Sequence, residues 1–277
     1  MWAGVIDPPR DWGKRAIVCN AYSGEYLLTW RRSEVERKIT GAAGEIYQQM
    51  IAVANQPAYL RVIAGAIWTG GQAREETLNP TTSIYDEVKR VATRAGCDWN
   101  VTPEFDGQGR LVFKANWYER MGVDRLFTLE EGVHIEMGTT PVKEQGALAN
   151  EIVGYGDGAA WASRPKSTQR DDTSVARYGL RQAAKSFGGA VITGTLEQNA
   201  YNELQARKNP RMTFTLSALD VGDTLANIRL GDRLPVRLVS CGFSGDGFGM
   251  STVVRVKGMA WDDSNGALDL VCDEDEE

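Results

Sequence analysis

His134 is the only histidine in the chain of 277 residues, so any mechanism that depends on histidine must use it. Nucleophilic catalysis would need a serine or cysteine held against its imidazole, and no nucleophile elbow lies near it in the sequence. A zinc site would need further ligands, which the widely spaced cysteines do not supply. Because His134 stands between Val133 and Ile135 in a pattern typical of a strand, we expect an ordinary structural or surface histidine.

Glu130, Glu131 and Glu144 are candidates for the paired carboxylates that cleave glycosidic bonds. Such a pair needs two carboxyl groups on either side of one cleft. Adjacent residues of a strand point to opposite faces of the sheet, so Glu130 and Glu131 would not share a cleft. We therefore predict solvated acids and no catalytic residue, while a cell-wall hydrolase stays open as an alternative.

Three further segments resemble ligand-binding loops only in part. Residues 154–158 read Gly-Tyr-Gly-Asp-Gly after a strand pattern, but the residues up to Pro165 cannot open the helix that a dinucleotide loop requires. Residues 242–249 are rich in glycine but lack the Gly-Lys-Ser/Thr of a phosphate loop. Residues 262–266 lack the alternating spacing of a calcium loop. We predict turns at all three, with no metal and no cofactor.

The composition is that of a soluble globular chain, with 42% hydrophobic and 25% charged residues. A formal net charge of -6 argues against a general nucleic-acid binder. No apolar run approaches the roughly 20 residues that span a bilayer, and the first residues lack the pattern of a signal peptide. We expect a chain made in a cytoplasm, with no stable membrane binding. Its cysteines are expected to be free and buried: Cys19, Cys97, Cys241 and Cys272.

The first part of the chain is predicted to be β-rich. Residues 7–11 read as a turn and residues 15–20 as a short strand. Alternating apolar residues predict a second strand at Tyr26–Arg32. Thr40 can cap a helix that runs to about Ala54. Strands and helix together would make a small domain.

The next part predicts a helix followed by a hairpin. Ser83 can cap an amphipathic helix, and Gly96 stands where a left-handed C-cap is expected. Alternating residues from Trp99, and again up to Phe113, predict two strands around a turn at Asp106-Gly107. These elements would form a small α+β module.

Residues 195–239 organise the rest of the chain. Thr195 and Gln198 have the spacing of a capping box, so a helix is expected to begin there and to end before Pro210. After Pro210, apolar and polar residues alternate, as in a half-buried strand. A tight turn at Leu230–Asp232 then leads into another strand. The residues expected to face the core are Leu196, Ala200, Tyr201, Leu204, Met212, Phe214, Leu216, Ala218, Leu234, Val236 and Leu238.

Residues 156–173 form a long polar stretch rich in glycine, serine and threonine. Such a loop inside a compact domain is usually functional, and it buries too little apolar surface to be ordered by itself. We predict an assembly contact with a neighbouring protein; a surface loop without a partner is the alternative. The charged residues concerned are Arg164, Lys166, Arg170, Asp171 and Asp172.

The order of these features resembles the last barrel-like domain of phage tail hub proteins. The residues that carry the resemblance are Asn150–Gly156, Ser174–Arg181, Thr195, Leu196, Ala200, Leu204, Pro210 and Leu230–Asp232. The resemblance implies an α+β fold with two β-rich barrel-like domains around a small helix-plus-hairpin module. We place the first, reduced domain at residues 1–56, the module at 57–125 and the second domain at 126–272. Residues 273–277 would be an acidic tail, solvated and disordered.

The resemblance also implies a function. Tail hubs are structural virion proteins that form homotrimeric rings between the tail tube and the tail tip, through which the tape-measure protein and DNA pass. The expected partners are two further copies of the chain, a tail tube or distal tail protein, the tape-measure protein and a tip fibre or spike. The strands that usually precede the first domain are missing here, so that barrel is either reduced or completed by a neighbour. A receptor- or carbohydrate-binding β-module is a second alternative.

Overall fold

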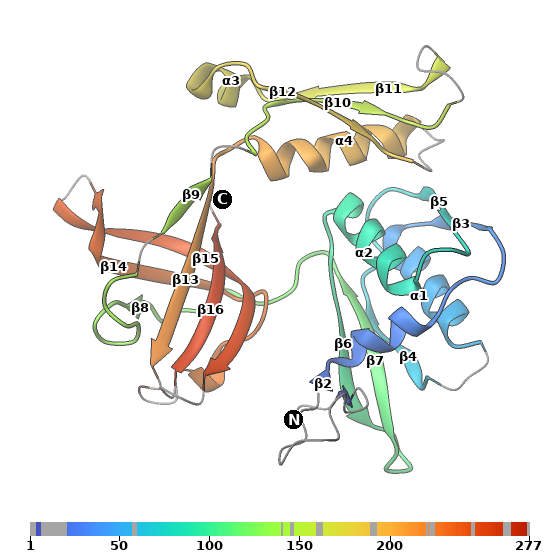
Figure 1. Ribbon diagram of the computed structural model, residues 1–277, viewed down its shortest axis with the longest axis horizontal. Coiled ribbons are helices and arrows are strands. Elements are labelled where there is room, and N and C mark those ends of the chain that lie inside the picture. The colour runs from blue at the N-terminus through green and yellow to red at the C-terminus, as the bar shows by residue number, and fades with distance from the viewer. Residues whose placement is uncertain are drawn as a thin grey trace, which may run out of the picture. The chain divides into compact units, whose positions relative to one another are not determined.

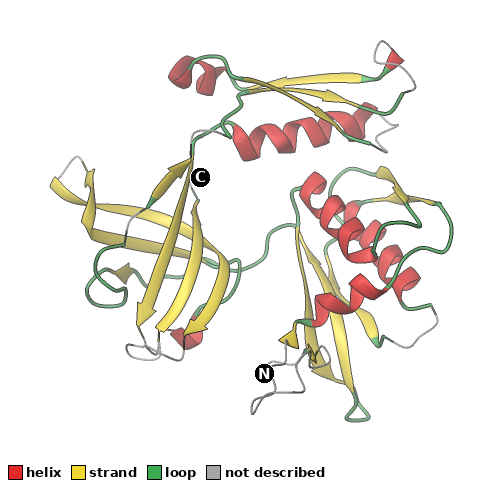
Figure 2. Ribbon diagram, viewed as in Figure 1, coloured by secondary structure: helices red, strands yellow, loops and turns green. Residues whose placement is uncertain are grey.

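The protein has a mixed α+β fold, as predicted (Figures 1 and 2). It divides into two compact units, each built from separate stretches of chain. The first unit comprises Met1–Glu119, Glu151–Arg170 and Gln182–Leu204, and the second comprises Arg120–Asn150, Asp171–Arg181 and Gln205–Glu277. The computed structural model describes residues 4–6, 21–56, 60–139, 141–144, 147–158, 163–188, 193–219, 221, 225–244, 247–262 and 267–275.

The larger core of the first unit lies between two helices and a three-stranded sheet. The helices are α1 (Ala43–Ala54) and α2 (Ile84–Ala95). The strands are β4 (Val62–Ile67), β7 (Leu111–Tyr118) and β6 (Asp98–Phe105), in that order across the sheet. Tyr47 of α1 and Trp117 of β7 are fully buried there, with ring centroids 5.0 Å apart. The hairpin predicted after the helix is thereby confirmed, and this core takes residues from both sides of position 56.

Helix α2 has the ends that its sequence predicts. The side chain of Ser83 accepts a hydrogen bond from Asp86 N at 3.1 Å, and Gly96 ends the helix with φ +68°. The predicted cap of α1 is wrong, because Thr40 lies in a strand and the helix begins after Ala42. Glu45 instead accepts a hydrogen bond from Ala42 N at 2.8 Å, which satisfies a free donor of the first turn.

The described residues of the N-terminal 56 form no closed barrel. The stretch predicted as a strand at Tyr26–Arg32 lies largely in a 3-10 helix, η1 (Gly24–Trp30). The strands β1 (Val5–Ile6) and β2 (Ala21–Tyr22) pair with each other. Strand β3 (Arg37–Gly41) pairs with β5 (Arg74–Leu78), which lies beyond the predicted boundary. The turn and strand predicted at residues 7–20 fall outside the described residues.

A second sheet of the first unit has the order β11-β10-β12. Strand β10 (Glu151–Tyr155) pairs antiparallel with β11 (Lys166–Arg170) and parallel with β12 (Gln182–Ser186). Helix α4 (Thr193–Arg207) packs on this sheet through Leu196 and Ala200 (Figure 1).

The predicted course of α4 is only partly right. It ends just before Pro210, as predicted, but its described residues begin at Thr193, so Thr195 lies inside the helix and is not its cap. Leu196, Ala200 and Leu204 are buried as expected, whereas Tyr201 is exposed.

The second unit is built on a six-stranded sheet with the order β8-β14-β15-β16-β13-β9. All neighbours are antiparallel except β8 and β14. The alternation predicted for two of the strands is confirmed, since Phe214, Leu216, Leu234 and Leu238 are all buried in one core. The strands are β8 (Leu129–Glu130), β9 (Val142–Glu144), β13 (Arg211–Leu219), β14 (Arg233–Ser244), β15 (Gly247–Asp262) and β16 (Ala267–Glu274). The 3-10 helix η3 (Leu225–Asn227) precedes β14, and helix α3 (Asp172–Tyr178) completes the unit.

The turn that follows edge strand β8 links it to β13. Ile135 forms a bridge with Glu131 and another with Ala218 of β13. A strand through Val133 and Met137 was expected here, but Val133, His134 and Met137 lie in turns. The strand order of the described residues does not close into a barrel.

The tight turn before β14 is confirmed. Gly231 has φ +85°, and a Cβ atom there would lie 2.5 Å from the carbonyl oxygen of Met121. Asp232 accepts hydrogen bonds from Val123 N at 3.0 Å and from Arg125 Nε at 2.7 Å. In the part of the chain described, no helix is both long enough and apolar enough to cross a membrane.

Candidate functional site

Glu131 is a buried acid with a structural set of partners. Its carboxylate accepts hydrogen bonds from Val239 N at 2.7 Å, Ser240 N at 2.8 Å and Gly138 N at 2.8 Å, and from the hydroxyl of Ser240. Burial alone would raise its pKa, but the hydrogen bonds from Ser240, Gly138 and Val239 lower it to about 2. An acid held this strongly in the ionised form cannot donate a proton near neutral pH. It fixes an irregular part of β14, whose register with β15 shifts after Leu238.

Glu130 and His134 do not form a catalytic pair with Glu131. His134 Nδ1 accepts a hydrogen bond from Glu130 N at 3.2 Å, which closes the turn after β8. The Glu130 side chain is exposed and lies 4.0 Å from Arg237 Nη1. The expected structural role of His134 fits this geometry, although in a turn and not in a strand. The side chain of Glu144 falls outside the described residues.

The first glycine of the segment at 154–158 serves the packing of a helix on a strand. Gly154 lies in β10, where a Cβ atom would come within 3.1 Å of the Phe187 ring and 3.2 Å of Ala200 Cβ. This glycine therefore allows α4 to pack closely on the sheet. Among the described residues, no group of acids, histidines and cysteines could hold a metal ion. Residues 263–266 are not described.

The described cysteines are free. Burial raises the pKa of the Cys97 thiol to about 11 and that of Cys272 to about 12. Burial also raises the pKa of Cys241. Such thiols are protonated at neutral pH and are therefore poor nucleophiles. Cys19 falls outside the described residues.

The predicted contact loop is largely ordered secondary structure. Lys166 and Arg170 lie in β11, where Arg170 Nη1 is 3.5 Å from Glu151 Oε2. Arg164 Nε donates to Gly158 O at 3.2 Å. The prediction of a continuous polar loop at residues 156–173 is therefore wrong for residues 166–170, because their backbone pairs with β10.

The two aspartates of that stretch serve helix α3. Asp171 caps it by accepting a hydrogen bond from Ser174 N at 2.8 Å, and it lies 3.3 Å from Lys208 Nζ. The Ser174 N–H and the Lys208 ammonium hold the pKa of Asp171 below its ordinary value. Asp172 is the first residue of the helix. A role of any of these residues in assembly stays a prediction.

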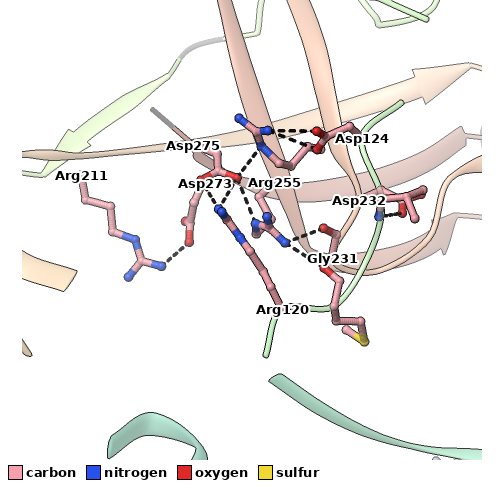
Figure 3. A network of polar contacts seen from close by, with 11 residues as sticks. Arg120, Asp124, Arg211, Gly231, Asp232, Arg255, Asp273 and Asp275 are labelled. Atoms are coloured by element: carbon pink, nitrogen blue, oxygen red, sulfur yellow. Dashed lines mark hydrogen bonds and ion pairs between the residues drawn. The ribbon is translucent and has the colours of Figure 1, made fainter. Parts of the chain in front are cut away.

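Sequence reasoning missed a network of arginines around Asp275 (Figure 3). Its Oδ2 atom lies 2.6 Å from Arg120 Nη2, 2.9 Å from Arg233 Nε and 3.0 Å from Arg255 Nε. Burial alone would raise the pKa of Asp275, but the positive charges of Arg255, Arg120 and Arg233 keep it below its ordinary value. The acidic tail was predicted to be disordered; this is wrong for the residues up to 275.

The network joins the end of β16 to the rest of the second unit. Arg255 Nη1 also donates to Met121 O and Gly231 O, both at 2.8 Å. Asp273 of β16 pairs with Arg211 of β13. Figure 3 shows Arg120 and Arg255 pointing towards Asp275, just after β16, and Arg211 pointing towards Asp273. Carboxylates so fully occupied by arginine stabilise structure and are not available for chemistry.

A different stretch of the second unit is suited to contact another protein. We call residues 123–142, which include edge strand β8 and reach into edge strand β9, the edge segment. Edge strands present unpaired backbone groups that can recruit another chain, and exposed apolar side chains mark interaction sites. The large apolar side chains that the edge segment exposes are Val123, Leu126 (98% exposed), Val133, Met137 and Val142.

No protein-family model matches the chain, and no curated protein matches its sequence. Solved structures do match. The prophage tail protein gp18 from Listeria monocytogenes EGD-e is similar with a TM-score of 0.60 and 13% identity, over 100% of this chain and 78% of that one. The tail protein from Neisseria meningitidis MC58 is similar with a TM-score of 0.58 and 15% identity, over 99% of this chain and 79% of that one. The 43 kDa tail protein of prophage MuSo2 from Shewanella oneidensis is similar with a TM-score of 0.57 and 13% identity, over 93% of this chain and 73% of that one.

The chain has the fold of prophage tail proteins. The likeness covers the stretches of chain that make up both units. At these identities it concerns the fold, and side-chain function must be argued from this chain itself.

Proposed function

We propose that this chain is a structural protein of the tail tip of a bacteriophage or phage-like particle. In this proposal it is a tail hub: three copies form a ring that joins the tail tube to the tip. The observation that carries the proposal is the likeness to three tail proteins over 93% or more of the chain.

The exposed edges of the second unit support assembly with further copies. β8 pairs with β14 through only two residues, and β9 pairs with β13 through only three. Together with the apolar side chains of the edge segment, these edges suit contacts in which a neighbouring copy continues the sheet. The barrel-like closure expected of such domains would then be completed in the ring.

The ring would have defined neighbours. We propose contacts with a tail tube or distal tail protein on one side and with a tip fibre or spike on the other. The tape-measure protein and DNA would pass through the ring, and the chain would not bind a membrane. The net charge of -6 agrees with a passage that does not retain DNA.

The alternatives have less support. A cell-wall hydrolase would need a proton donor, and the carboxylate of Glu131 already accepts hydrogen bonds from five donor groups. A receptor- or carbohydrate-binding module would need an exposed aromatic platform. Trp261 and Trp30 are exposed, but they belong to different units.

The mass of the purified particle tests the proposal. We expect native mass spectrometry to give about 91 kDa, three times the 30.4 kDa of one chain, and micrographs to show rings. A stable monomer at high micromolar concentration would contradict the tail-hub proposal.

A surface substitution tests which face is used. Leu126→Asp should shift the mass towards the monomer without loss of secondary structure, because Leu126 is almost fully exposed. Leu180→Asp is the matched control, since Leu180 is an exposed leucine of another loop of the second unit. If both variants dissociate equally, or neither does, the edge segment is not the contact surface.

A further inference from the structure

The chain enters the second unit through residues 120–125, which we call the entry segment. They follow directly on Glu119, which ends a stretch of the first unit. The entry segment binds to the second unit in two places, one for its near half (residues 120–122) and one for its far half (residues 123–125). These attachments determine whether the chain enters the second unit at a fixed point.

The far half is attached through Asp232 and the main chain of β14. Asp232 Oδ1 accepts a hydrogen bond from Val123 N at 3.0 Å, and its Oδ2 accepts one from Arg125 Nε at 2.7 Å. Arg233 N donates to Val123 O at 3.0 Å, and Arg125 N donates to Arg233 O at 2.8 Å. Asp124 lies 3.2 Å from Arg233 Nη1. Because Asp232 is buried and two of the bonds are main-chain bonds, this attachment belongs to the sheet itself.

The near half is attached through Asp275, which lies just after β16. The Asp275 carboxylate accepts a hydrogen bond from Arg120 Nη2 at 2.6 Å and another from Arg255 Nε at 3.0 Å. Arg255 Nη1 in turn donates to Met121 O at 2.8 Å. A carboxylate 155 residues further along the chain therefore holds Arg120 directly and holds Met121 through Arg255.

Three guanidinium groups surround this carboxylate, as Figure 3 shows for Arg120 and Arg255. The third is that of Arg233, whose Nε lies 2.9 Å from Asp275 Oδ2. Arg255 is buried and is also fixed by Gly231 O, which accepts a hydrogen bond from its Nη1 at 2.8 Å. The Arg120 side chain is 55% exposed, so the arginine cluster can be reached from solvent on that side. Its buried members keep a partner other than Asp275.

We propose that these three arginines form a carboxylate-binding site whose ligand is the chain's own Asp275, and that the bound carboxylate latches the near half of the entry segment to the second unit. Arginine suits this role because its N–H groups form charge-assisted hydrogen bonds to carboxylates. When the carboxylate is absent, the near half detaches while the far half stays bound through Asp232. The latch consists of side-chain contacts, so it opens without breaking a pair of strands.

Asp275→Ala tests the latch, because it removes the carboxylate and leaves the arginines in place. Hydrogen–deuterium exchange of the full chain at pH 7, followed by mass spectrometry of overlapping fragments, reports local opening of the backbone. The near-half amides should exchange several-fold faster than in the native chain, and the far-half amides at the native rate. Asp269→Ala, on β16, is the matched control and should leave both halves unchanged.

Sodium acetate tests the binding site, because it supplies the carboxylate that Asp275→Ala lacks. A ligand that binds only the folded state raises the unfolding midpoint with a saturable dependence on its concentration. We expect such a rise for Asp275→Ala in acetate, together with a return of near-half exchange towards the native rate. Sodium chloride at equal ionic strength should do neither, and the native chain should not respond to acetate. Adding Arg120→Gln to Asp275→Ala should abolish the rescue.

Arg120→Gln alone keeps the latch testable if Asp275→Ala does not fold, since it removes only the exposed arginine. It should speed exchange in the near half and leave the far half unchanged. The proposal is overturned if the near half exchanges at the native rate in these variants, or if both halves accelerate equally, which would show a general loss of stability. It is also overturned if acetate gives Asp275→Ala no saturable rise.

Discussion

Asp275 Oδ2 accepts a hydrogen bond from Arg255 Nε at 3.0 Å, with only 14% and 7% of the two side chains exposed. A main-chain hydrogen bond holds the same residue, because Asp275 N donates to Val253 O at 2.9 Å. The end of β16 is thus fastened to β15 by side chain and main chain together.

Removal of the Asp275 charge should destabilise the second unit. Asp275→Asn leaves Arg120, Arg233 and Arg255 without their shared carboxylate. We expect the free energy of unfolding to fall by about 1.5–3 kcal/mol, the range for lost hydrogen bonds to charged groups. Urea unfolding checks this. Asp269→Asn, on the same strand, is the control and should change the free energy by less than about 0.5 kcal/mol. Equal losses in both variants would contradict a specific role of the network.

Ionised Glu131 should make stability depend on pH. Its pKa is about 2 in the folded protein, below the ordinary value of 4.5, so the folded state favours the charged form. This contribution is complete above pH 4.5 and is lost as the pH falls from 4.5 towards 2. Glu131→Gln should therefore lose less stability than the native chain over that window, as measured by midpoints of urea unfolding. Glu130→Gln is the control: because the Glu130 side chain is exposed, the stability of this variant should depend on pH as that of the native chain does. If the unfolding midpoint of Glu131→Gln depends on pH as that of the native chain does, other acids determine the pH dependence of stability.

The purified protein should not cleave cell walls. We expect no acid–base pair from Glu130 and Glu131, because the Glu130 side chain is exposed near Arg237 and the Glu131 carboxylate is held ionised by hydrogen bonds. A zymogram with peptidoglycan should show no clearing. Clearing that disappears in Glu131→Gln, but is retained after substitution of the distant exposed Glu104, would favour a hydrolase instead.

A side chain at Gly154 should loosen the packing of α4. A Cβ atom fits only if neighbours move by a few tenths of an ångström, and the methyl groups of valine add further overlap. Gly154→Val should cost about 1–3 kcal/mol of unfolding free energy. Gly107→Val, in an exposed turn with open space around it, is the control. If Gly154→Val is as stable as the native chain, a glycine at this position is not required for the packing of α4.

Trypsin reports on the predicted contact of residues 156–173. Because Lys166 and Arg170 lie in β11, cleavage after them requires local opening. We expect slower cutting there than after Arg110, which is exposed at the hairpin turn, and still slower cutting in assembled tails. Mass spectrometry of the fragments gives the rates. Equal rates in free and assembled protein would leave the stretch without a role in assembly.

Local sequence signals predicted local structure well. Ser83 and Gly96 bound α2 because their side-chain and backbone preferences act within a few residues. The same holds for the turn at Gly231 and for the alternation around Phe214. The strand expected at Tyr26–Arg32 was wrong, because the residues that face the core are Gly24, Leu27 and Leu28, at the spacing of a 3-10 helix, while Trp30 is exposed.

Partners far apart in the sequence could not be predicted. Thr40 looked like a helix cap because its strand partner, Glu75, lies 35 residues away. Asp275 looked solvated because Arg120 is 155 residues away. Charged residues carry no periodic signal that identifies such partners.

The division into units has a consequence for inheritance. The chain passes between the units after residues 119, 150, 170, 181 and 204. A single genetic crossover between residues 131 and 204 would combine part of each unit with a foreign remainder and separate the paired strands β8 and β14. Exchange of one unit between related genomes would need several simultaneous crossovers, so this gene should be inherited as one block.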